Sequence, residues 1–301
     1  MKPTAKTEVI PRGGLVRCPS IPQVRDLVRA WRREGHRVGF VPTMGALHIG
    51  HASLVEAARR RCDRVVASVF VNPTQFGPKE DLSKYPRDLE GDARTLEQAG
   101  CHALFSTTPE EMYPAGYATW VTVEGLTDGL CGRTRPGHFR GVTTVVTKLL
   151  CLVQPDDLFL GEKDRQQLQV LKRMALDLNL PVTVHGCPTV REQDGLAFSS
   201  RNAFLSVDER QRARALSRGL FRARAAYAAG ERDARALEQA VRAELEGVDA
   251  RVHYVDAVAL DTLRPVERAA DDTVIAVAAF VGTTRLIDNH VLGEPFPVQV
   301  P

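Results

Sequence analysis

Short runs of β-branched and aliphatic residues alternate with longer amphipathic stretches over the first 187 residues. Strands that alternate with helices are typical of βαβ units and a parallel sheet. We therefore expect an α/β fold with a Rossmann-like, doubly wound parallel sheet, which binds ligands beyond the carboxyl ends of its strands. The apolar runs predict strands at 38–41, 64–71, 103–106, 157–160 and 182–185, and the amphipathic stretches predict helices at 50–62, 88–99, 142–152 and 165–178.

The pattern changes after Pro188. Helical spacing at 208–229 and 234–245 is followed by strand patterns at 252–260 and 273–280 and by a last strand near Leu286. We expect two domains, a Rossmann-like unit at 1–188 that binds the substrates and a smaller α+β lid at 189–301. The polar loop 189–195, which ends in a glycine, suits a hinge between them.

The tetrad His48-Ile49-Gly50-His51 stands where the first apolar strand passes through Pro42 into a helix. The first turn of a helix has unpaired N–H groups and a positive dipole end, which favour a phosphate. Gly50 permits close approach, and two histidines three apart project from the same face. The alternative is that the histidines only cap the helix or pack beside it.

Two further polar clusters fall at predicted loops. Gly161-Glu162-Lys163-Asp164 follows the strand 157–160, and Lys163 is suited to a phosphate and Asp164 to a ribose hydroxyl. Phe198-Ser199-Ser200-Arg201-Asn202 follows the hinge and combines two hydroxyls with a guanidinium. Taken singly, the first is also an ordinary charged turn and the second a capping sequence. Together with the tetrad they resemble the two-signature nucleotidylyltransferase superfamily, which includes class I aminoacyl-tRNA synthetases.

The motif set resembles that of the pantothenate synthetase family more specifically, in the family's order and strongly over residues 38–206. The segments that carry the resemblance are 42–48 (PTMGALH), 70–76 (FVNPTQF), 135–142 (RPGHFRGV), 161–164 (GEKD) and 199–202 (SSRN), with a weaker continuation at 283–289 (TTRLIDN).

The resemblance implies an ATP-dependent ligase that joins pantoate to beta-alanine through an enzyme-bound pantoyl adenylate, with Mg²⁺ and without a tightly bound organic cofactor. It implies that Gln75 and Gln167 hold pantoate and form the substrate site for pantoate and beta-alanine, and that His51 is the proton donor. We expect His48, Lys163 and Arg201 to act with His51. It places ATP against Met44, Gly45, Ala46, Leu47, His48, Ile49, Gly50, His51, Gly161, Glu162, Lys163, Asp164, Val190, Phe198, Ser199, Ser200 and Arg201.

The chain departs from the family at three positions. Ile49 replaces a residue that is often acidic, Arg165 occupies a position that is commonly aromatic, and Phe198 stands where methionine is usual. The direction in which Arg165 points is open. No dedicated metal cage stands out, and the carboxylates nearest to the motifs are Asp81, Asp88 and Asp92, which also suit surface or helix-start positions.

The composition of the chain argues against several classes of protein. No stretch approaches the roughly 18 apolar residues of a spanning helix, so we expect a cytoplasmic protein without a membrane partner. Six scattered cysteines without a C-x-x-C pair argue against a zinc ribbon and a disulfide scaffold. The net charge of +3 is too small to indicate nucleic acid, although an arginine-rich helical run at 210–224 leaves an RNA-contacting surface as an alternative.

Two other hypotheses stay open at this point. One is a nucleotidylyltransferase that stops at nucleotide transfer, and the other is a non-catalytic nucleotide- or RNA-binding protein. An apolar strand near the edge of the first domain, together with the family resemblance, also predicts a homodimer.

Overall fold

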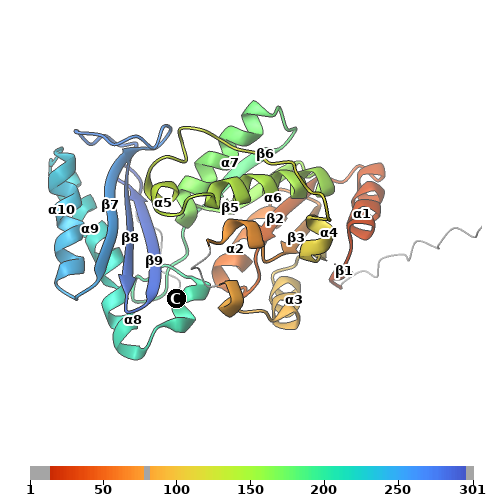
Figure 1. The fold of residues 1–301 in the computed structure, drawn as a ribbon, viewed down its shortest axis with the longest axis horizontal. Coiled ribbons are helices and arrows are strands. Elements are labelled where there is room, and N and C mark those ends of the chain that lie inside the picture. Colours follow the sequence, from red (N-terminus) through yellow and green to blue (C-terminus); the bar gives the residue numbers. More distant parts are fainter. Residues whose placement is uncertain (1–13, 78–81, 296–301) are drawn as a thin grey trace, which may run out of the picture.

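The computed structural model describes residues 14–77 and 82–295. Its larger sheet has six strands in the order β1-β4-β3-β2-β5-β6, and every neighbouring pair is parallel. From β2 the chain builds outward in one direction through β3 and β4 and then returns to add β5 and β6 on the other side (Figure 1). The predicted doubly wound α/β sheet is confirmed, with its topological switch point between β2 and β5.

The larger unit alternates strands and helices along the chain. Its strands are β1 (Val16–Cys18), β2 (Val38–Thr43), β3 (Arg64–Val69), β4 (Ala103–Ser106), β5 (Asp157–Gly161) and β6 (Thr183–Cys187). Its helices are α1 (Ile21–Arg33), α2 (Ile49–Arg59), α3 (Leu89–Gln98), α4 (Pro109–Met112), α5 (Leu130–Thr134), α6 (His138–Val153) and α7 (Arg165–Asp177), and its 3₁₀ turns are η1 (Pro73–Gln75), η2 (Leu82–Lys84) and η3 (Glu162–Asp164).

Side chains that alternate along each strand place helices on both faces of this sheet. Phe40 and Leu158 pack with α1, α6 and α7, whereas their neighbours Val41 and Phe159 pack with α2 and α3. Because successive residues of a strand point to opposite faces, one apolar run fills both layers. This explains why the strands are continuously apolar rather than alternating with polar residues.

The remainder of the chain forms a three-stranded antiparallel sheet, β7-β8-β9, whose outer face is covered by α9 and α10 (Figure 1). The inner face joins the core of the larger unit through residues such as Tyr254 and Val274. The elements are the 3₁₀ turn η4 (Ser200–Phe204), the helices α8 (Val207–Ala213), α9 (Ala215–Ala228) and α10 (Ala234–Glu246), and the strands β7 (Arg251–Ala259), β8 (Thr273–Val281) and β9 (Thr284–Val291).

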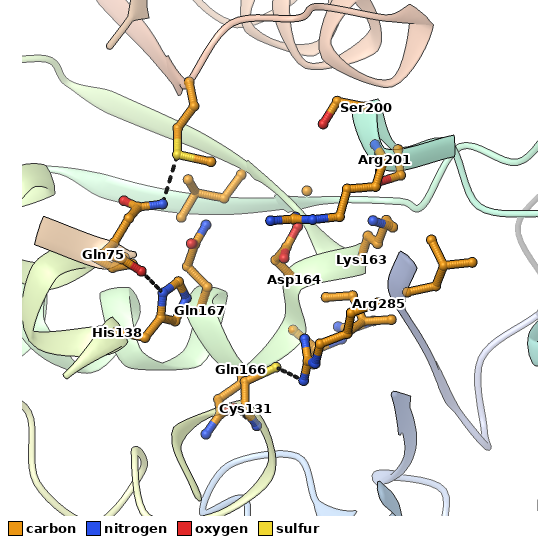
Figure 2. Close-up of a pocket in the computed structure, with 18 of the residues that line it drawn as sticks. Gln75, Cys131, His138, Lys163, Asp164, Gln166, Gln167, Ser200, Arg201 and Arg285 are labelled. Atoms are coloured by element: carbon orange, nitrogen blue, oxygen red, sulfur yellow. Dashed lines mark hydrogen bonds between the residues drawn. The ribbon is translucent and has the colours of Figure 1, made fainter. Parts of the chain in front are cut away.

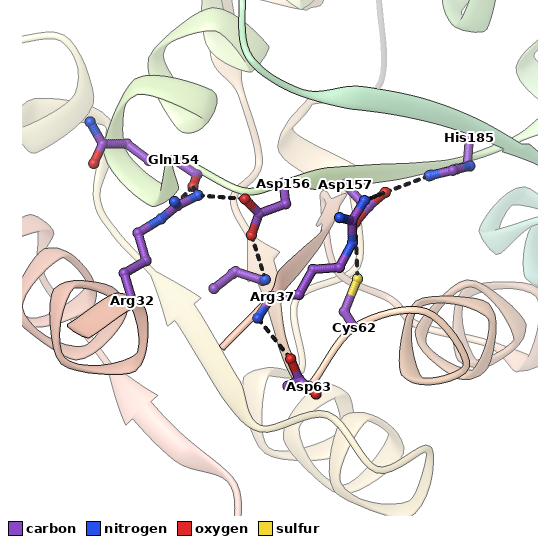
Figure 3. Close-up of polar contacts among 9 residues, drawn as sticks. Arg32, Arg37, Cys62, Asp63, Gln154, Asp156, Asp157 and His185 are labelled. Atoms are coloured by element: carbon purple, nitrogen blue, oxygen red, sulfur yellow. Dashed lines mark hydrogen bonds and ion pairs between the residues drawn. The ribbon is translucent and has the colours of Figure 1, made fainter. Parts of the chain in front are cut away.

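Charged groups tie together the amino-terminal ends of β2 and β5 (Figure 3). The buried carboxylate of Asp157 accepts two hydrogen bonds from Arg37 (2.6 and 2.9 Å), one from the Cys62 thiol (3.3 Å) and one at 2.7 Å from His185 Nε2. Burial opposes ionisation of Asp157, but these donors outweigh it and lower the pKa of its carboxyl. We refer to Arg37, Cys62, Asp157 and His185 as the amino-edge cluster.

The structure differs from the sequence expectations mainly at element ends. β1 and α1 were not expected, although Val24, Val28 and Trp31 line the buried side of α1 at helical spacing. The expected helix 208–229 is two helices that meet at Arg214. The helix expected at 142–152 begins at 138, because Gly137 adopts a left-handed φ of 81° and starts it a turn earlier.

Candidate functional site

The predicted motif residues gather in a cleft of about 750 Å³ at the carboxyl-terminal edge of the parallel sheet. β2 leads into the tetrad and β5 leads into Lys163, so the switch point lies between them. The C-terminal sheet closes the other side of the cleft. The predicted residues that line it are Met44, His48, Gly50, His51, Gln75, Gly161, Lys163, Asp164, Gln167, Val190, Phe198, Ser199, Ser200 and Arg201.

His48 and His51 form a capping box at the start of α2. His48 Nδ1 accepts a hydrogen bond from the Gly50 N–H (3.1 Å), and His51 Nδ1 accepts one from the His48 N–H (3.3 Å). Since each Nδ1 is an acceptor, the proton of each neutral ring is on Nε2. The histidines do cap the helix, and the capping leaves both Nε2–H groups available to a ligand in the cleft.

Both imidazoles are neutral near pH 7. Burial is the main cause, and it lowers the pKa of His48 from 6.5 to about 4 and that of His51 from 6.5 to about 3. The positive charge of Lys163 lowers both values further, and His48 adds to the effect at His51. The rings lie with centroids 4.2 Å apart. In this state they are hydrogen-bond donors rather than cations.

Asp92 fastens the turn that precedes the tetrad. Gly45 (φ 88°) and Ala46 (φ 51°) both have left-handed backbones, which is unfavourable for alanine. The buried Asp92 carboxylate accepts the N–H groups of Ala46 (3.2 Å) and Leu47 (2.7 Å) from the start of α3. Burial raises the pKa of Asp92 against the effect of these donors. The sequence offered Asp92 as a metal ligand or as a surface or helix-start carboxylate, and the structure shows it buried in α3 and bonded to this turn.

The second motif lies between β5 and α7. Gly161, Lys163 and Asp164 line the cleft, while Glu162 turns aside and accepts from Arg165 Nη2 (3.3 Å). Asn289 of β9 donates through Nδ2 to the backbone carbonyls of Glu162 (3.0 Å) and Lys163 (2.8 Å). The C-terminal sheet therefore fixes the backbone that presents Lys163.

The third motif is attached to the same sheet. The buried guanidinium of Arg191 forms a two-pronged ion pair with Asp288 of β9, at 2.6 and 2.9 Å. From this anchor the chain returns through Phe198, whose ring stacks on His48 with centroids 5.9 Å apart. Ser200 and Arg201 then face Lys163 and Asp164 across the cleft (Figure 2).

Gln75 and Gln167 lie on the side of the cleft opposite to Arg201 (Figure 2). Gln75 Nε2 donates to Met44 Sδ (2.8 Å) and Gln75 Oε1 accepts from Asn72 Nδ2 (3.1 Å). The Gln75 carbonyl contacts His138 Nδ1 (2.8 Å) and Arg135 Nη2 (3.3 Å). The side-chain amide of Gln75 is thus held in one orientation by Met44 and Asn72, while His138 and Arg135 fix its backbone.

Neighbouring glutamines of α7 divide two tasks. Gln166 is buried and binds the backbone of α5, accepting from Cys131 N (2.9 Å) and donating to the Gly129 carbonyl (2.9 Å). Gln167, one residue on, faces the cleft. The sequence alone did not show the role of Gln166.

The three departures from the family pattern have distinct surroundings. Ile49 is 44% exposed and does not line the cleft, whereas Phe198 forms the wall against His48. Arg165 lines the cleft but its guanidinium bonds Asn289 Oδ1 (3.2 Å) and Glu162. Arg165 thus ties β9 to η3, which settles its direction.

Within residues 14–77 and 82–295, no group of three or more His, Cys, Asp or Glu residues is arranged to hold a metal ion. Asp88 caps α3 by accepting from Gly91 N, and Asp92 is committed to the turn. The third candidate, Asp81, lies outside the described residues. Of the carboxylates that line the cleft, Asp288 is paired with Arg191, which leaves Asp164 facing the cavity.

Among the residues that the structure describes, three of the six arginines in the run at 210–224 pair with carboxylates of the same chain. Arg210 pairs with Glu192 and Asp194, while Arg218 and Arg222 share Glu244. These contacts account for part of the run and weaken the RNA-binding alternative. In the part of the chain that the structure describes, no helix has the length and apolar character needed to cross a membrane.

A family profile described as pantoate-beta-alanine ligase matches residues 17–291. The chain is 55% identical over 277 residues to the pantothenate synthetase of Myxococcus xanthus, which covers 91% of this chain and 95% of that protein. It is 52% identical over 278 residues to the pantothenate synthetase of Pelotomaculum thermopropionicum, covering 92% and 99%.

Solved structures agree with this match. The pantothenate synthetase of Thermus thermophilus superposes with a TM-score of 0.88 at 47% identity, covering 94% of this chain and all of that one. A pantoate-beta-alanine ligase of Francisella tularensis, described as complexed with beta-gamma ATP and beta-alanine, superposes with a TM-score of 0.77 at 30% identity, covering 94% and 99%.

Proposed function

The chain belongs to the pantoate-beta-alanine ligase family, and from this premise we propose how its cleft carries out the ligation of pantoate to beta-alanine with ATP. The observation that carries the proposal is the convergence of two neutral Nε2–H donors, Lys163 and the Ser200–Arg201 segment on one cavity at the switch point. This set matches a polyphosphate, which needs several donors and cations at once.

ATP lies along the carboxyl edge of the sheet in this proposal. His48 and His51 donate to phosphate oxygens at the start of α2, where the helix dipole adds to the attraction. Lys163 and Arg201 supply positive charge from opposite walls, and Asp164 receives the ribose. Met44, Gly161, Val190, Phe198 and Ser199 complete the binding surface.

Pantoate binds between Gln75 and Gln167. An amide can donate to a carboxylate or hydroxyl and accept from a hydroxyl, which suits a dihydroxy acid. The contacts from Met44 and Asn72 hold the Gln75 amide before pantoate arrives. Two amides that suit a dihydroxy acid favour the ligase over a transferase that stops at nucleotide transfer.

In the first step the pantoate carboxylate attacks the α-phosphorus of ATP and pyrophosphate leaves, giving a pantoyl adenylate. The carboxylate is ionised already, since carboxyl pKa values lie near ~4, so no base is needed. The requirement is stabilisation of negative charge on the transition state. Neutral imidazoles with pKa values of about 3 and 4 meet it by hydrogen bonding rather than by releasing a proton.

In the second step the amine of beta-alanine attacks the acyl carbon and AMP leaves. Burial makes His48 and His51 poor bases, so neither is suited to take the amine proton. Exclusion of water by the C-terminal unit protects the mixed anhydride until the amine arrives.

Mg²⁺ would be held chiefly by the phosphates of ATP, because residues 14–77 and 82–295 contain no group of three or more metal-binding side chains, and it would neutralise phosphate charge there. We further propose that the enzyme is a homodimer that works in the cytoplasm, with no nucleic acid partner. These three points rest on the sequence and the family.

An isotope-exchange assay tests the proposal. Labelled pyrophosphate should exchange into ATP when pantoate alone is added, and AMP should form only after beta-alanine is supplied. Exchange with pantoate that is not followed by AMP formation when beta-alanine is added would favour simple nucleotide transfer and overturn the scheme.

A further inference from the structure

Arg285 of β9 reaches the floor of the cleft beside Cys131 (Figure 2). Its Nε donates to His253 Nδ1 (3.1 Å), and its Nη2 donates to Cys131 Sγ and to Thr134 Oγ1, each at 3.5 Å. Every one of these acceptors is uncharged or weakly polar. In residues 14–77 and 82–295, no carboxylate forms an ion pair with Arg285.

The positive charge of Arg285 is therefore not neutralised by its neighbours. Burial first, and then the charges of Arg285, Arg251 and Arg133, lower the pKa of His253, which keeps that ring uncharged near neutral pH. A guanidinium facing a cavity with only neutral acceptors around it favours an anion from outside the protein.

The other cations of the cleft have assigned partners. Arg165 lies against Glu162 and Glu294, and Arg135 donates to the Gln75 carbonyl. Lys163 and Arg201 face each other where the proposed function puts the triphosphate. Arg285 remains, on the wall supplied by the C-terminal sheet rather than by the phosphate-binding motifs.

One anion of the proposed reaction has no cationic partner yet. The pantoate carboxylate is consumed when the adenylate forms, whereas the acceptor amino acid keeps its carboxylate throughout. Building on the proposed function, we propose that Arg285 binds the carboxylate of the acceptor and thereby selects a short ω-amino acid over an amine that has no carboxylate. The acceptor nitrogen bonds to the acyl carbon, the bond from that carbon to the AMP oxygen breaks, and the amine proton passes to water.

The test compares Arg285→Met with wild type, using beta-alanine and beta-alaninamide as acceptors. We expect kcat/KM for beta-alanine to fall on the order of 10² fold, because a charge-assisted contact is lost. The value for beta-alaninamide, which has no carboxylate, should change little, so the preference for beta-alanine over its amide should collapse. Arg285→Lys should recover part of it.

Arg133→Met is the matched control, because Arg133 lies on the adjacent α5, is paired with Asp256 and does not line the cleft. It should keep the wild-type preference. Pantoate-driven pyrophosphate exchange should be normal in Arg285→Met. If the wild-type enzyme itself showed no such exchange, the result would count against the proposed function and not against the role of Arg285. Normal exchange with an unchanged preference for beta-alanine over beta-alaninamide would overturn the role of Arg285.

Discussion

The two edges of the parallel sheet carry similar side chains and use them in opposite ways. At the amino edge, Arg37, Asp157 and His185 satisfy one another within hydrogen-bonding distance (Figure 3). At the carboxyl edge, His48 and His51 line the cleft and accept backbone N–H groups through Nδ1, and within residues 14–77 and 82–295 their Nε2–H groups form no hydrogen bond. The first arrangement stabilises the fold, while the second keeps donors for a ligand.

The comparison shows that polar residue types alone do not distinguish structure from function. A histidine beside a carboxylate, a cysteine and an arginine lies at the amino edge, and it would look like a catalytic group in a list of residues. Burial and its hydrogen bond to Asp157 raise the pKa of the Cys62 thiol to about 12, so that thiol is not a nucleophile. The end of the strand from which a side chain projects is the better guide.

The largest expected effect separates the edges by activity. His51→Asn keeps an acceptor for the His48 N–H but removes the donor to phosphate, so pantoate-dependent pyrophosphate exchange should fall on the order of 10² to 10³ fold. His51→Gln, whose amide can donate from the Nε2 position, should recover part of the rate. His185→Asn at the amino edge should leave exchange intact. A His51→Asn enzyme with near wild-type exchange would remove the distinction.

The next effect separates the edges by stability. Asp157→Asn leaves Arg37 and His185 without their anion, and we expect the free energy of unfolding to fall by about 2–4 kcal/mol in urea titrations. The KM values for ATP and pantoate should not change. If the variant kept its stability but lost activity, the amino-edge cluster would belong to the function after all.

A smaller effect divides the cleft itself. Gln75→Ala should raise the KM for pantoate about 10- to 100-fold, since a hydrogen bond to a charged group is lost, and should hardly change the KM for ATP. Steady-state kinetics with each substrate varied in turn measure both. Equal increases would move Gln75 out of the pantoate site.

The smallest effect concerns pH. The folded-state pKa values of His48 and His51 are about 4 and 3, below the unfolded value of 6.5, so their contribution is present above pH 6.5 and is lost as the pH falls toward 4 and 3. Because the lowered pKa of Asp157 acts only below its usual 3.8, the Asp157 carboxyl should not contribute to a change in stability between pH 7 and pH 5.

Urea unfolding at pH 7 and pH 5 measures this difference. His51→Asn should lose about 2 kcal/mol less than wild type on acidification, because one proton fewer is taken up on unfolding. Equal losses in both proteins would show that His51 titrates normally in the folded state.

Local patterns predicted what local interactions determine. The apolar strand, Pro42 and the tetrad predicted both the passage from strand to helix and the edge of the sheet at which it lies. Both features depend on residues that are adjacent in the sequence. The break at Arg214 and the early start of α6 depend on backbone geometry that hydrophobic spacing does not encode. The arginines among the apolar positions of α1 hid that helix, although its spacing was regular.

Contacts between distant segments could not be predicted. Asp92 meets the turn at Ala46 across 46 positions, and Arg285 meets Cys131 across 154. Such side chains acquire their roles only when the sheet has brought the segments together. The resemblance did place Arg285 within a shared motif, 283–289, but gave it no task.

Two adjacent residues of β9 connect the two walls that a phosphate chain would bridge. Asp288 secures Arg191 and with it the segment leading to Arg201, and Asn289 secures the backbone at Lys163. Because neighbouring residues on a strand point to opposite sides, β9 sets the distance between the two cations, Lys163 and Arg201. Inserting or deleting one residue in β9 would exchange the directions of Asp288 and Asn289 and displace both cations, although neither Asp288 nor Asn289 needs to contact ATP.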